Sequence, residues 1–321
     1  MKLFVTGAAG FIGSNYVRWV LANSDDEVTI FDALTYAGNL ESIRDVLENP
    51  RCRFVHADIC DQDAVLQAMD GHEAVVHFAA ESHVDRSIAD PYAFVRTNCF
   101  GTNVVCDVAR QVGVGRFLHI STDEVYGSID VGSFSETDRL TPRSPYSASK
   151  AGSDLIALSY VTTHDLPVVV TRCSNNYGAY QFPEKVIPLF TTNLLDGQQV
   201  PLYGDGGNVR DWIHVEDHNR AAHLVLQRGV VGEVYNIGAH HEITNRELTY
   251  TLLELCGRDE SAIRPVADRL GHDRRYSVNI DKITSLGWQV ERTFDQAIEE
   301  TVRWYRDNRW WWEPLKAQAG L

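Results

Sequence analysis

Tyr146 and Lys150 are two residues whose types and four-residue spacing suit proton transfer. Ser144 can cap a helix and Pro145 suits its first turn, so a helix is predicted over 145–164. On that helix both side chains lie on one face. A lysine beside a tyrosine favours the phenolate, and so moves a group with an ordinary pKa of about 10 towards a usable base.

Two adjacent carboxyls, Asp123 and Glu124, form a second candidate set, and Thr122 precedes them. Burial and mutual repulsion can separate the pKa values of neighbouring carboxyls, so that one is protonated near neutrality while the other is ionised. Successive side chains of a strand point to opposite faces, and Thr122 ends a predicted strand. The backbone must therefore turn after Thr122 if both carboxyls are to face one site. The alternative for such a pair is a solvated acidic loop.

Three glycines, Gly7, Gly10 and Gly13, follow the first predicted strand and open the first predicted helix. They permit a tight turn and close approach of the backbone to a pyrophosphate, which the helix N-terminus also favours. The spacing is not the usual G-x-G-x-x-G, but its position between strand and helix favours a dinucleotide site over a structural turn. Asp32 ends the second predicted strand. A carboxylate there binds a ribose 2′-OH and repels a 2′-phosphate, so NAD is favoured over NADP.

The elements that must position these residues alternate along the first half of the chain. Continuous apolar runs predict strands at 3–6, 28–31, 53–57, 74–79, 117–121 and 168–172, and helical patterns lie between them at 11–22, 61–69, 91–112 and 145–164. This alternation predicts an α/β protein with a Rossmann-type doubly wound parallel sheet. We expect an NAD-binding domain over residues 1–173 and a smaller mixed α/β domain, mainly for substrate, over 174–321. The segment 208–236 is expected to pack back on the first domain.

Several further segments occur in the order typical of one known family. They are 80–87, 122–127, 174–178, 181–185, 203–212 and 268–276. With its Thr122, Tyr146 and Lys150, the chain resembles the extended short-chain dehydrogenase/reductase superfamily. In these segments it is similar to the dTDP-glucose 4,6-dehydratases, from residue 1 to Pro314.

The resemblance implies an NAD-dependent hydro-lyase that converts dTDP-glucose to dTDP-4-keto-6-deoxyglucose and water in deoxysugar biosynthesis. Thr122 would bond the sugar oxygen that is oxidised at C4. Tyr146 would be the base for that oxidation, with Lys150 beside it. Glu124 would take the C5 proton, and Asp123 would protonate the departing C6 hydroxyl.

The expected binding residues come from the same motifs and their surroundings. Those for NAD are Gly7, Gly10, Phe11, Ile12, Gly13, Asp32, Asp58, Ile59, Ala80, Ser82, Thr97, Tyr146, Lys150 and Asn176. Those for substrate are Ser82, His83, Thr122, Asn175, Lys185, Val186, Pro201, Tyr203, Arg210, Asn245, Arg269, His272 and Tyr276. Arg210 is the best phosphate candidate, since arginine binds phosphate in a bidentate manner. No metal is expected, because neither histidines nor cysteines have metal-site spacing.

The composition excludes several kinds of partner. Lys and Arg number 29 against 44 Asp and Glu, a net charge of −15, which argues against nucleic acid or an anionic membrane as a partner. No apolar run approaches the roughly 18 residues of a membrane span. The start of the chain lacks a signal-peptide pattern and the cysteines lack pair spacing, so we expect a cytoplasmic protein. The resemblance implies a homodimer through the helices at 91–112 and 145–164.

Other activities on the same scaffold are a sugar-nucleotide 4-epimerase, a decarboxylase of nucleotide-linked uronic acids and a non-enzymatic NAD sensor. An epimerase shares the glycine loop, Tyr146 and Lys150, but it needs no base at C5. The decarboxylase likewise has no need of the pair Asp123 and Glu124. Retention of all five catalytic candidates argues against the sensor, so the dehydratase is favoured.

Overall fold

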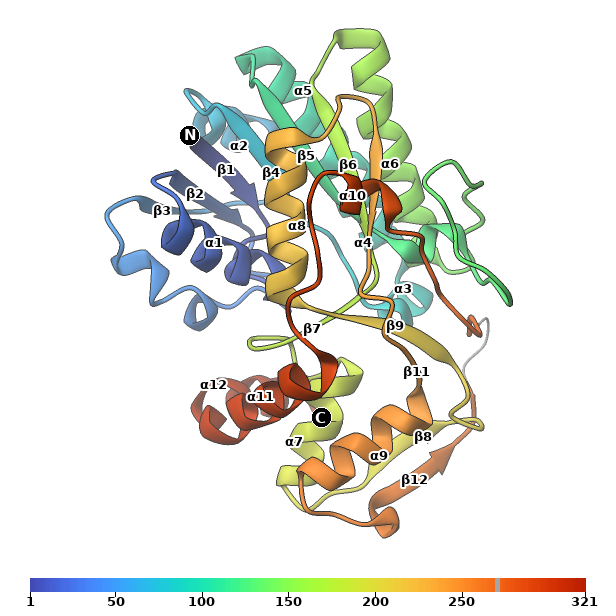
Figure 1. Cartoon of the computed structure of the whole chain (residues 1–321). Coiled ribbons are helices and arrows are strands. Elements are labelled where there is room, and N and C mark those ends of the chain that lie inside the picture. Colours follow the sequence, from blue (N-terminus) through green and yellow to red (C-terminus); the bar gives the residue numbers. More distant parts are fainter. Residues whose placement is uncertain (269–271) are drawn as a thin grey trace.

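A seven-stranded parallel sheet forms the centre of the larger part of the molecule in this computed structural model, which describes residues 1–268 and 272–321 (Figure 1). In spatial order its strands are β3 (Cys52–His56), β2 (Glu27–Asp32), β1 (Lys2–Thr6), β4 (Ala74–His77), β5 (Arg116–Thr122), β6 (Val168–Cys173) and β10 (Val234–Ile237). Every neighbouring pair is parallel. The order reverses between β1 and β4, and ligands bind at such a switch point. The predicted Rossmann-type sheet is confirmed.

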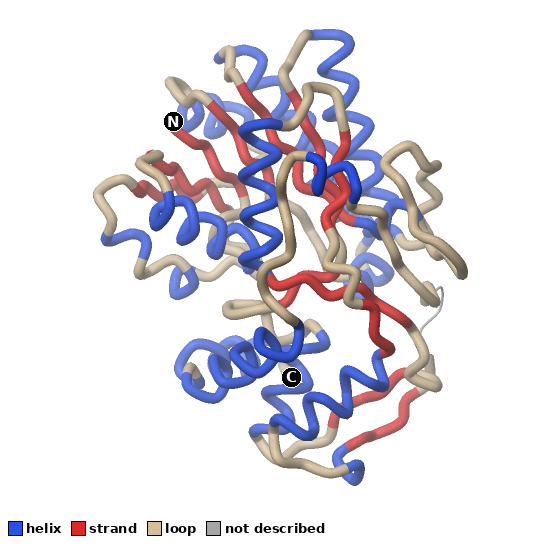
Figure 2. The backbone as a smooth tube through the Cα atoms, in the orientation of Figure 1, coloured by secondary structure: helices blue, strands red, loops and turns tan. Residues whose placement is uncertain are grey.

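Helices cover both faces of this sheet, as Figure 2 shows. One face carries α1 (Phe11–Asn23), α8 (Val215–Arg228) and α10 (Asp281–Ser285). The other carries α2 (Gln62–Met69), α5 (Thr102–Val112) and α6 (Pro145–His164). Buried on both sides, the strands are apolar without alternation, which is why their sequence pattern is continuous. None of the helices in the described residues is long and apolar enough to cross a bilayer.

The helix predicted over 91–112 is in fact three consecutive segments: α4 (Pro91–Phe94), the π-helical η3 (Val95–Gly101) and α5. Asn98 in the π-helical segment accepts a hydrogen bond from Glu81 N, and its Nδ2 donates to Ser149 Oγ, 2.8 Å away. π-Helical turns frequently occur at functional sites. Here the turn joins α6 to the loop after β4, which the short α3 (Val84–Ala89) follows.

In the described residues, the smaller part of the molecule combines two short sheets with four α-helices. The three-stranded sheet contains β7 (Asn175–Tyr177), β9 (Val209–His214) and β11 (Glu242–Thr244), and the second sheet pairs β8 (Val200–Tyr203) with β12 (Ile263–Val266). The helices are α7 (Val186–Leu195), α9 (Asn245–Leu255), α11 (Phe294–Asp307) and α12 (Arg309–Ala319). Short 3₁₀ turns are η1 (Leu40–Ser42), η2 (Val46–Glu48), η4 (Asp123–Tyr126) and η5 (Glu260–Ala262). Although α8 and β10 come late in the chain, they lie on the large sheet.

The C-terminal helix α12 is fixed to the body by two tryptophans. Trp311 and Trp312 are buried with Tyr305 in one aromatic cluster. Trp312 Nε1 donates a 2.7 Å hydrogen bond to Tyr305 O, and Trp311 Nε1 donates to Ser42 Oγ at 3.1 Å. These contacts join the end of the chain to both parts of the molecule.

Candidate active site

A cleft of about 480 Å³ lies at the carboxyl ends of the central strands, at the switch point of the sheet. It is lined by residues from both parts of the molecule, which brings most of the predicted site together. The predicted residues along it are Gly7, Gly10, Phe11, Ile12, Gly13, Asp32, Asp58, Ile59, Ala80, Ser82, Thr97, Thr122, Asp123, Glu124, Tyr146, Lys150, Asn175, Asn176 and Lys185. A single elongated ligand could therefore contact both the glycine loop and the catalytic candidates.

The glycine loop has a physical need for glycine at two positions. Gly7 has φ +69°, and a Cβ there would lie 2.5 Å from Ala79 N. A Cβ on Gly13 would lie 2.6 Å from Gly7 O, so the helix could not start this close to the strand. Gly10 is the N-cap of α1, and the first residues of that helix line the cleft. Such a helix start favours an anion.

Asp32 holds two loops around the cleft. Its Oδ2 accepts from Ala9 N at 2.9 Å in the glycine loop, and its Oδ1 accepts from Leu34 N at 2.8 Å. Burial raises the pKa of this carboxyl, and the two backbone donors oppose the rise. Asp32 therefore has a structural role in addition to any contact with a ribose.

The two adjacent carboxyls lie on a turn. Strand β5 ends at Thr122, and η4 begins with Asp123, where Thr122 Oγ1 accepts from Glu124 N at 3.2 Å. This 3₁₀ turn provides the change of direction that lets both carboxyls line the cleft. Burial raises the pKa of Asp123 well above its ordinary value, and the neighbouring charge of Glu124 adds to the rise. These surroundings favour the protonated form of Asp123.

Helix α6 carries Tyr146 and Lys150 into the cleft. Ser144 caps its start in a capping box, with Pro145 in the first turn, as the sequence predicts. Burial raises the pKa of Tyr146 well above its ordinary value; the charge of Glu124 adds to this, and a hydrogen bond with Thr122 opposes it. Burial therefore outweighs, in the protein alone, any lowering of the Tyr146 pKa by the lysine. Lys150 Nζ instead donates to the backbone O of residue 120, 2.8 Å away.

The cleft fits the predicted dinucleotide and sugar in a further respect. Several buried polar atoms of residues that line it have no hydrogen-bond partner among the described residues: Ser121 Oγ, Asp123 Oδ2, Ser174 Oγ, Asn175 Oδ1 and Asn176 Oδ1. Buried polar groups are normally paired, so a concentration of unpaired ones is typical of a ligand site. In the described residues, no group of three or more His, Cys, Asp or Glu side chains could hold a metal ion.

A cluster around Arg210 borders the catalytic turn from the smaller part of the molecule. Arg210 is 5% exposed, its Nη2 donates to Asp273 O at 2.9 Å, and its guanidinium lies 4.1 Å from the centre of the Tyr276 ring. Tyr276 Oη donates to Asp273 Oδ2 at 2.7 Å. The charge of Arg210 acts on Asp123, whose pKa it lowers against the larger effect of burial. The structure therefore brings this predicted phosphate ligand close to Asp123, one of the two candidate catalytic carboxyls.

Other predicted substrate residues do not line the cleft itself. Pro201 and Tyr203 lie on β8, Asn245 begins α9, and the rings of Tyr203 and His272 are 6.5 Å apart. His83 caps α3, and Val186 is the first residue of α7, next to Lys185. Arg269 lies outside the described residues.

The cleft also contains residues that the sequence reasoning did not identify. They lie mostly in the loops after β2, β4 and β7, and include Tyr36, Gly38, Glu81, Gln181 and Glu184. Gly38 is one that geometry explains, because a Cβ there would lie 2.7 Å from Asp32 Oδ1. A signal was available, since residues just after strand ends form the ligand site of open α/β sheets.

A Rossmann-type sheet whose switch-point cleft holds a threonine, a tyrosine and a lysine defines the extended short-chain dehydrogenases/reductases. The profile of the GDP-mannose 4,6 dehydratase family matches residues 4–301. The dTDP-glucose 4,6-dehydratase of Streptomyces antibioticus is 56% identical over 323 residues, which cover 98% of this chain and 96% of that protein. The crystal structure of DesIV, the dTDP-glucose 4,6-dehydratase of Streptomyces venezuelae, contains NAD. Its comparison with this chain gives a TM-score of 0.97 and 56% sequence identity, and covers 98% of this chain and 100% of DesIV. The chain belongs to the dTDP-glucose 4,6-dehydratase family.

A more distant solved structure has a different activity. The NAD complex of the UDP-glucose 4-epimerase of Thermus thermophilus has a TM-score of 0.90 and 31% identity, covering 96% of this chain and 100% of that one. The fold alone therefore does not separate a dehydratase from an epimerase, and the site must do so.

Proposed function

We propose that this protein is a dTDP-glucose 4,6-dehydratase, which uses NAD to convert dTDP-glucose into dTDP-4-keto-6-deoxyglucose and water for deoxysugar biosynthesis. One observation carries the proposal: Asp123 and Glu124 lie on a single turn in the cleft that also contains Tyr146. A 4-epimerase needs a base for oxidation at C4 and has no use for a second acid–base pair. The names of the most similar relatives support the same activity.

The first step is removal of the C4 hydroxyl proton. Tyr146 accepts this proton, and Thr122, which is hydrogen-bonded to Tyr146, orients the same sugar oxygen. NAD, when bound, accepts the C4 hydride and later returns it to C6, and its positive nicotinamide favours the Tyr146 phenolate. Lys150 contributes a second positive charge from the same helix face. The glycine loop and Asp32 would hold the dinucleotide.

The second step is elimination across C5 and C6. It requires one carboxyl to be ionised and the other to be protonated. Glu124 takes the C5 proton, which the C4 ketone has made acidic. Asp123 donates its proton to the departing C6 hydroxyl. The raised pKa of Asp123 supports this assignment, because the group that donates must hold a proton at neutral pH. Arg210 would bind the diphosphate of the substrate.

We further propose a homodimer in the cytoplasm. Tyr92 on α4 and Val95 and Phe100 on η3 are exposed apolar side chains that line a hollow of about 660 Å³, and Tyr92 is 84% exposed. Leu155 on α6, next to the lining residue Ile156, is exposed as well. A second copy of the same helices is the expected occupant. Analytical ultracentrifugation tests this proposal: a dimer is expected, and a monomer at micromolar concentration would contradict it. All six cysteines are free, which suits a reducing compartment.

The division into domains is also a proposal. Residues 1–173 form the cofactor-binding domain, together with α8 and β10 from the segment 208–236. The remaining residues after 173 mainly form the substrate domain. The position of α8 and β10 on the large sheet supports this division.

The activity is tested by incubating the purified protein with dTDP-glucose, without reductant, and following the sugar nucleotide by mass spectrometry. We expect a product lighter by one water, with no net NADH. An unchanged mass would contradict the proposal. NMR of the same sample would then detect a galactose-configured product, which an epimerase gives.

A further inference from the structure

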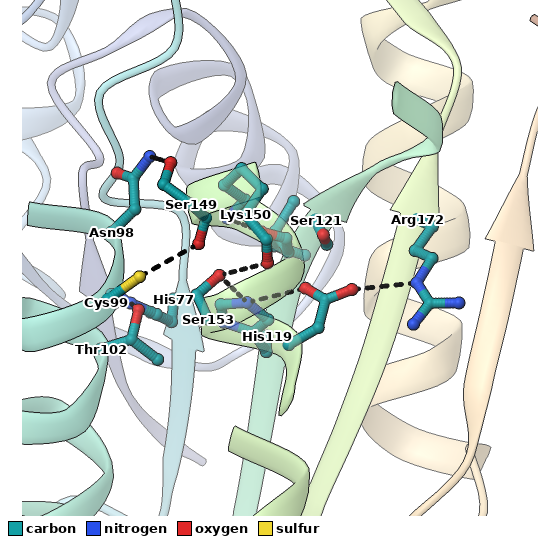
Figure 3. A network of polar contacts seen from close by, with 12 residues as sticks. His77, Asn98, Cys99, Thr102, His119, Ser121, Ser149, Lys150, Ser153 and Arg172 are labelled. Atoms are coloured by element: carbon teal, nitrogen blue, oxygen red, sulfur yellow. Dashed lines mark hydrogen bonds and ion pairs between the residues drawn. The ribbon is translucent and has the colours of Figure 1, made fainter. Parts of the chain in front are cut away.

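A fully buried aspartate lies on the catalytic helix, one turn beyond the lysine. Tyr146, Lys150 and Asp154 follow each other at four-residue intervals on α6, and Asp154 has no exposed surface. Its Oδ2 accepts from Arg172 Nε on β6 at 2.9 Å. Its Oδ1 lies 3.3 Å from His119 Nε2 on β5. Figure 3 shows His119 and Arg172 in this network, together with Lys150.

The other end of the network reaches the catalytic turn. Arg172 Nη1 donates to Tyr126 Oη at 2.8 Å, and the guanidinium lies 4.9 Å from the centre of that ring. Tyr126 is the last residue of η4, the turn that begins with Asp123. The Tyr126 hydroxyl donates in turn to Asn236 Oδ1 at 2.8 Å. This hydroxyl therefore accepts one hydrogen bond and donates another, and the two bonds fix its position.

His119 is neutral in this setting, which leaves Arg172 as the counter-ion of Asp154. Burial lowers the pKa of His119, and the charge of Lys150 adds to this. Ser153 Oγ donates to Lys150 O at 2.8 Å, so at 3.1 Å it accepts from His119 Nε2–H. The imidazole thus carries its proton on the nitrogen that faces Asp154.

A buried ion pair is a poor way to stabilise a fold, because desolvation of the two charges can exceed their attraction. Apolar side chains of similar volume would fill the same space without that cost. The position of this pair suggests another use, since its two partners contact the helix with the oxidation base and the turn with the elimination acid and base.

We propose that Asp154 and Arg172 are positioning residues that join the Tyr146–Lys150 helix to the catalytic turn through Tyr126. The inference rests on the proposed dehydratase activity. The ion pair fixes the distance between the groups for the first step and those for the second. Neither residue contacts the reacting atoms.

The same carboxylate acts on the charge of Lys150. Burial lowers the pKa of Lys150, and Asp154 is the strongest of the groups that raise it. The titratable groups that interact with the charge of Lys150 come from α6, η3, β4, β5 and β6: Asp154, Cys99, His77, His119 and Cys173. Tyr146 lies one turn earlier on α6, and Arg172 is paired with Asp154. Of these groups, Asp154 is the carboxylate, and it forms the ion pair with Arg172. Loss of its charge would lower the pKa of Lys150 further.

Tyr126→Phe is the decisive variant, because it removes one hydroxyl and leaves the ion pair in place. Single-turnover mixing with dTDP-glucose separates the steps: absorbance at 340 nm reports C4 oxidation, and deuterium uptake from D2O reports C5 proton removal. We expect C4 oxidation at the wild-type rate and C5 exchange slowed by about tenfold or more. Tyr160→Phe, which removes a hydroxyl from the other side of α6, is the control and should leave both rates unchanged.

Asp154→Asn tests the effect of this carboxylate on Lys150 through the pH profile of C4 oxidation. A purely structural role of Asp154 would leave that profile unchanged. We expect the alkaline limb of the pH profile for C4 oxidation to move to lower pH by about one unit or more, because the lysine loses its proton earlier. If this variant does not fold, Tyr126→Phe alone decides the proposal. Unchanged C5 exchange in Tyr126→Phe would overturn it, as would an unshifted profile in a folded Asp154→Asn. Failure of the wild-type protein to convert dTDP-glucose would instead refute the proposed function.

Discussion

Replacement of Asp123 by asparagine should slow the loss of the C6 hydroxyl in the proposed elimination, while C4 oxidation and C5 proton removal continue. The side chain has the same shape and keeps its place on η4, where Asp123 Oδ1 accepts from Thr122 Oγ1 at 3.3 Å. An amide cannot deliver a proton to the leaving hydroxyl. Loss of a positioned general acid costs about 10²–10⁴ in rate, which is about 3–5 kcal/mol in the activation free energy. The reduced cofactor and the C4 ketone should then accumulate.

Stopped-flow absorbance at 340 nm and mass spectrometry in D2O would measure this outcome. We expect a persistent NADH signal, deuterium uptake at C5 near the wild-type rate, and slow loss of water. Asp130→Asn changes an exposed carboxyl in the loop that follows and serves as the control. Dehydration by Asp123→Asn at more than about a tenth of the wild-type rate would refute the role of Asp123 as the acid.

The same variant should be more stable than the wild type at neutral and alkaline pH. Because burial raises the pKa of Asp123, the folded protein retains a proton that the unfolded chain releases above about pH 4. Stability is therefore lost as the pH rises from that value through the folded pKa, by about 1.4 kcal/mol for each unit of pKa difference. Asparagine does not ionise, so the melting temperatures of variant and wild type should agree near pH 3 and diverge as the pH rises. Equal melting temperatures at pH 8 would contradict a buried, protonated Asp123.

Three further substitutions test other parts of the structure. Glu124→Gln should still oxidise C4 but should show no C5 deuterium exchange, and wild-type exchange would remove Glu124 as the base. Gly7→Ala places a Cβ 2.5 Å from Ala79 N at a φ of +69°. Its NAD affinity in equilibrium titrations should therefore fall by more than about tenfold. Unaltered affinity would contradict the close approach of the backbone at Gly7. Trp312→Ala empties a fully buried site and should lower the free energy of unfolding in urea by about 3–5 kcal/mol, and a loss below about 1 kcal/mol would show that α12 contributes little.

Much of the fold follows from the sequence because strands buried on both faces have a distinctive pattern. The six predicted strands all occur, and the helix over 145–164 has the predicted bounds, since Ser144 and Pro145 mark its start chemically. The break of the helix over 91–112 at η3 was not predictable by periodicity. Within η3, Asn98 bonds Ser149 Oγ, and Gly101 lies where a Cβ would be 2.5 Å from the Ile59 side chain. Both are contacts with distant segments, which periodicity does not encode.

The polar network behind the site is a second feature that the sequence does not reveal. Asp154 is in the same helical stripe as Tyr146 and Lys150, but nothing local marks it as buried. Its partner Arg172 is in a run otherwise typical of an apolar strand. Their relation to Tyr126 exists only because β5 and β6 are neighbours in the sheet. Spacing along one element is readable from the sequence, whereas contacts between elements require the fold.

Two buried aspartates in and behind this site have pKa values shifted in opposite directions, and their partners explain why. Burial by itself favours the neutral form of both. For Asp154 this is outweighed by the His119 N–H and by the charges of Arg172 and Lys150, so its pKa is lowered. For Asp123 the largest neighbouring charge is the like charge of Glu124, so its pKa is raised. The partners of Asp154 therefore favour a negative charge behind the lysine, while the surroundings of Asp123 favour the protonated form that the proposed elimination requires.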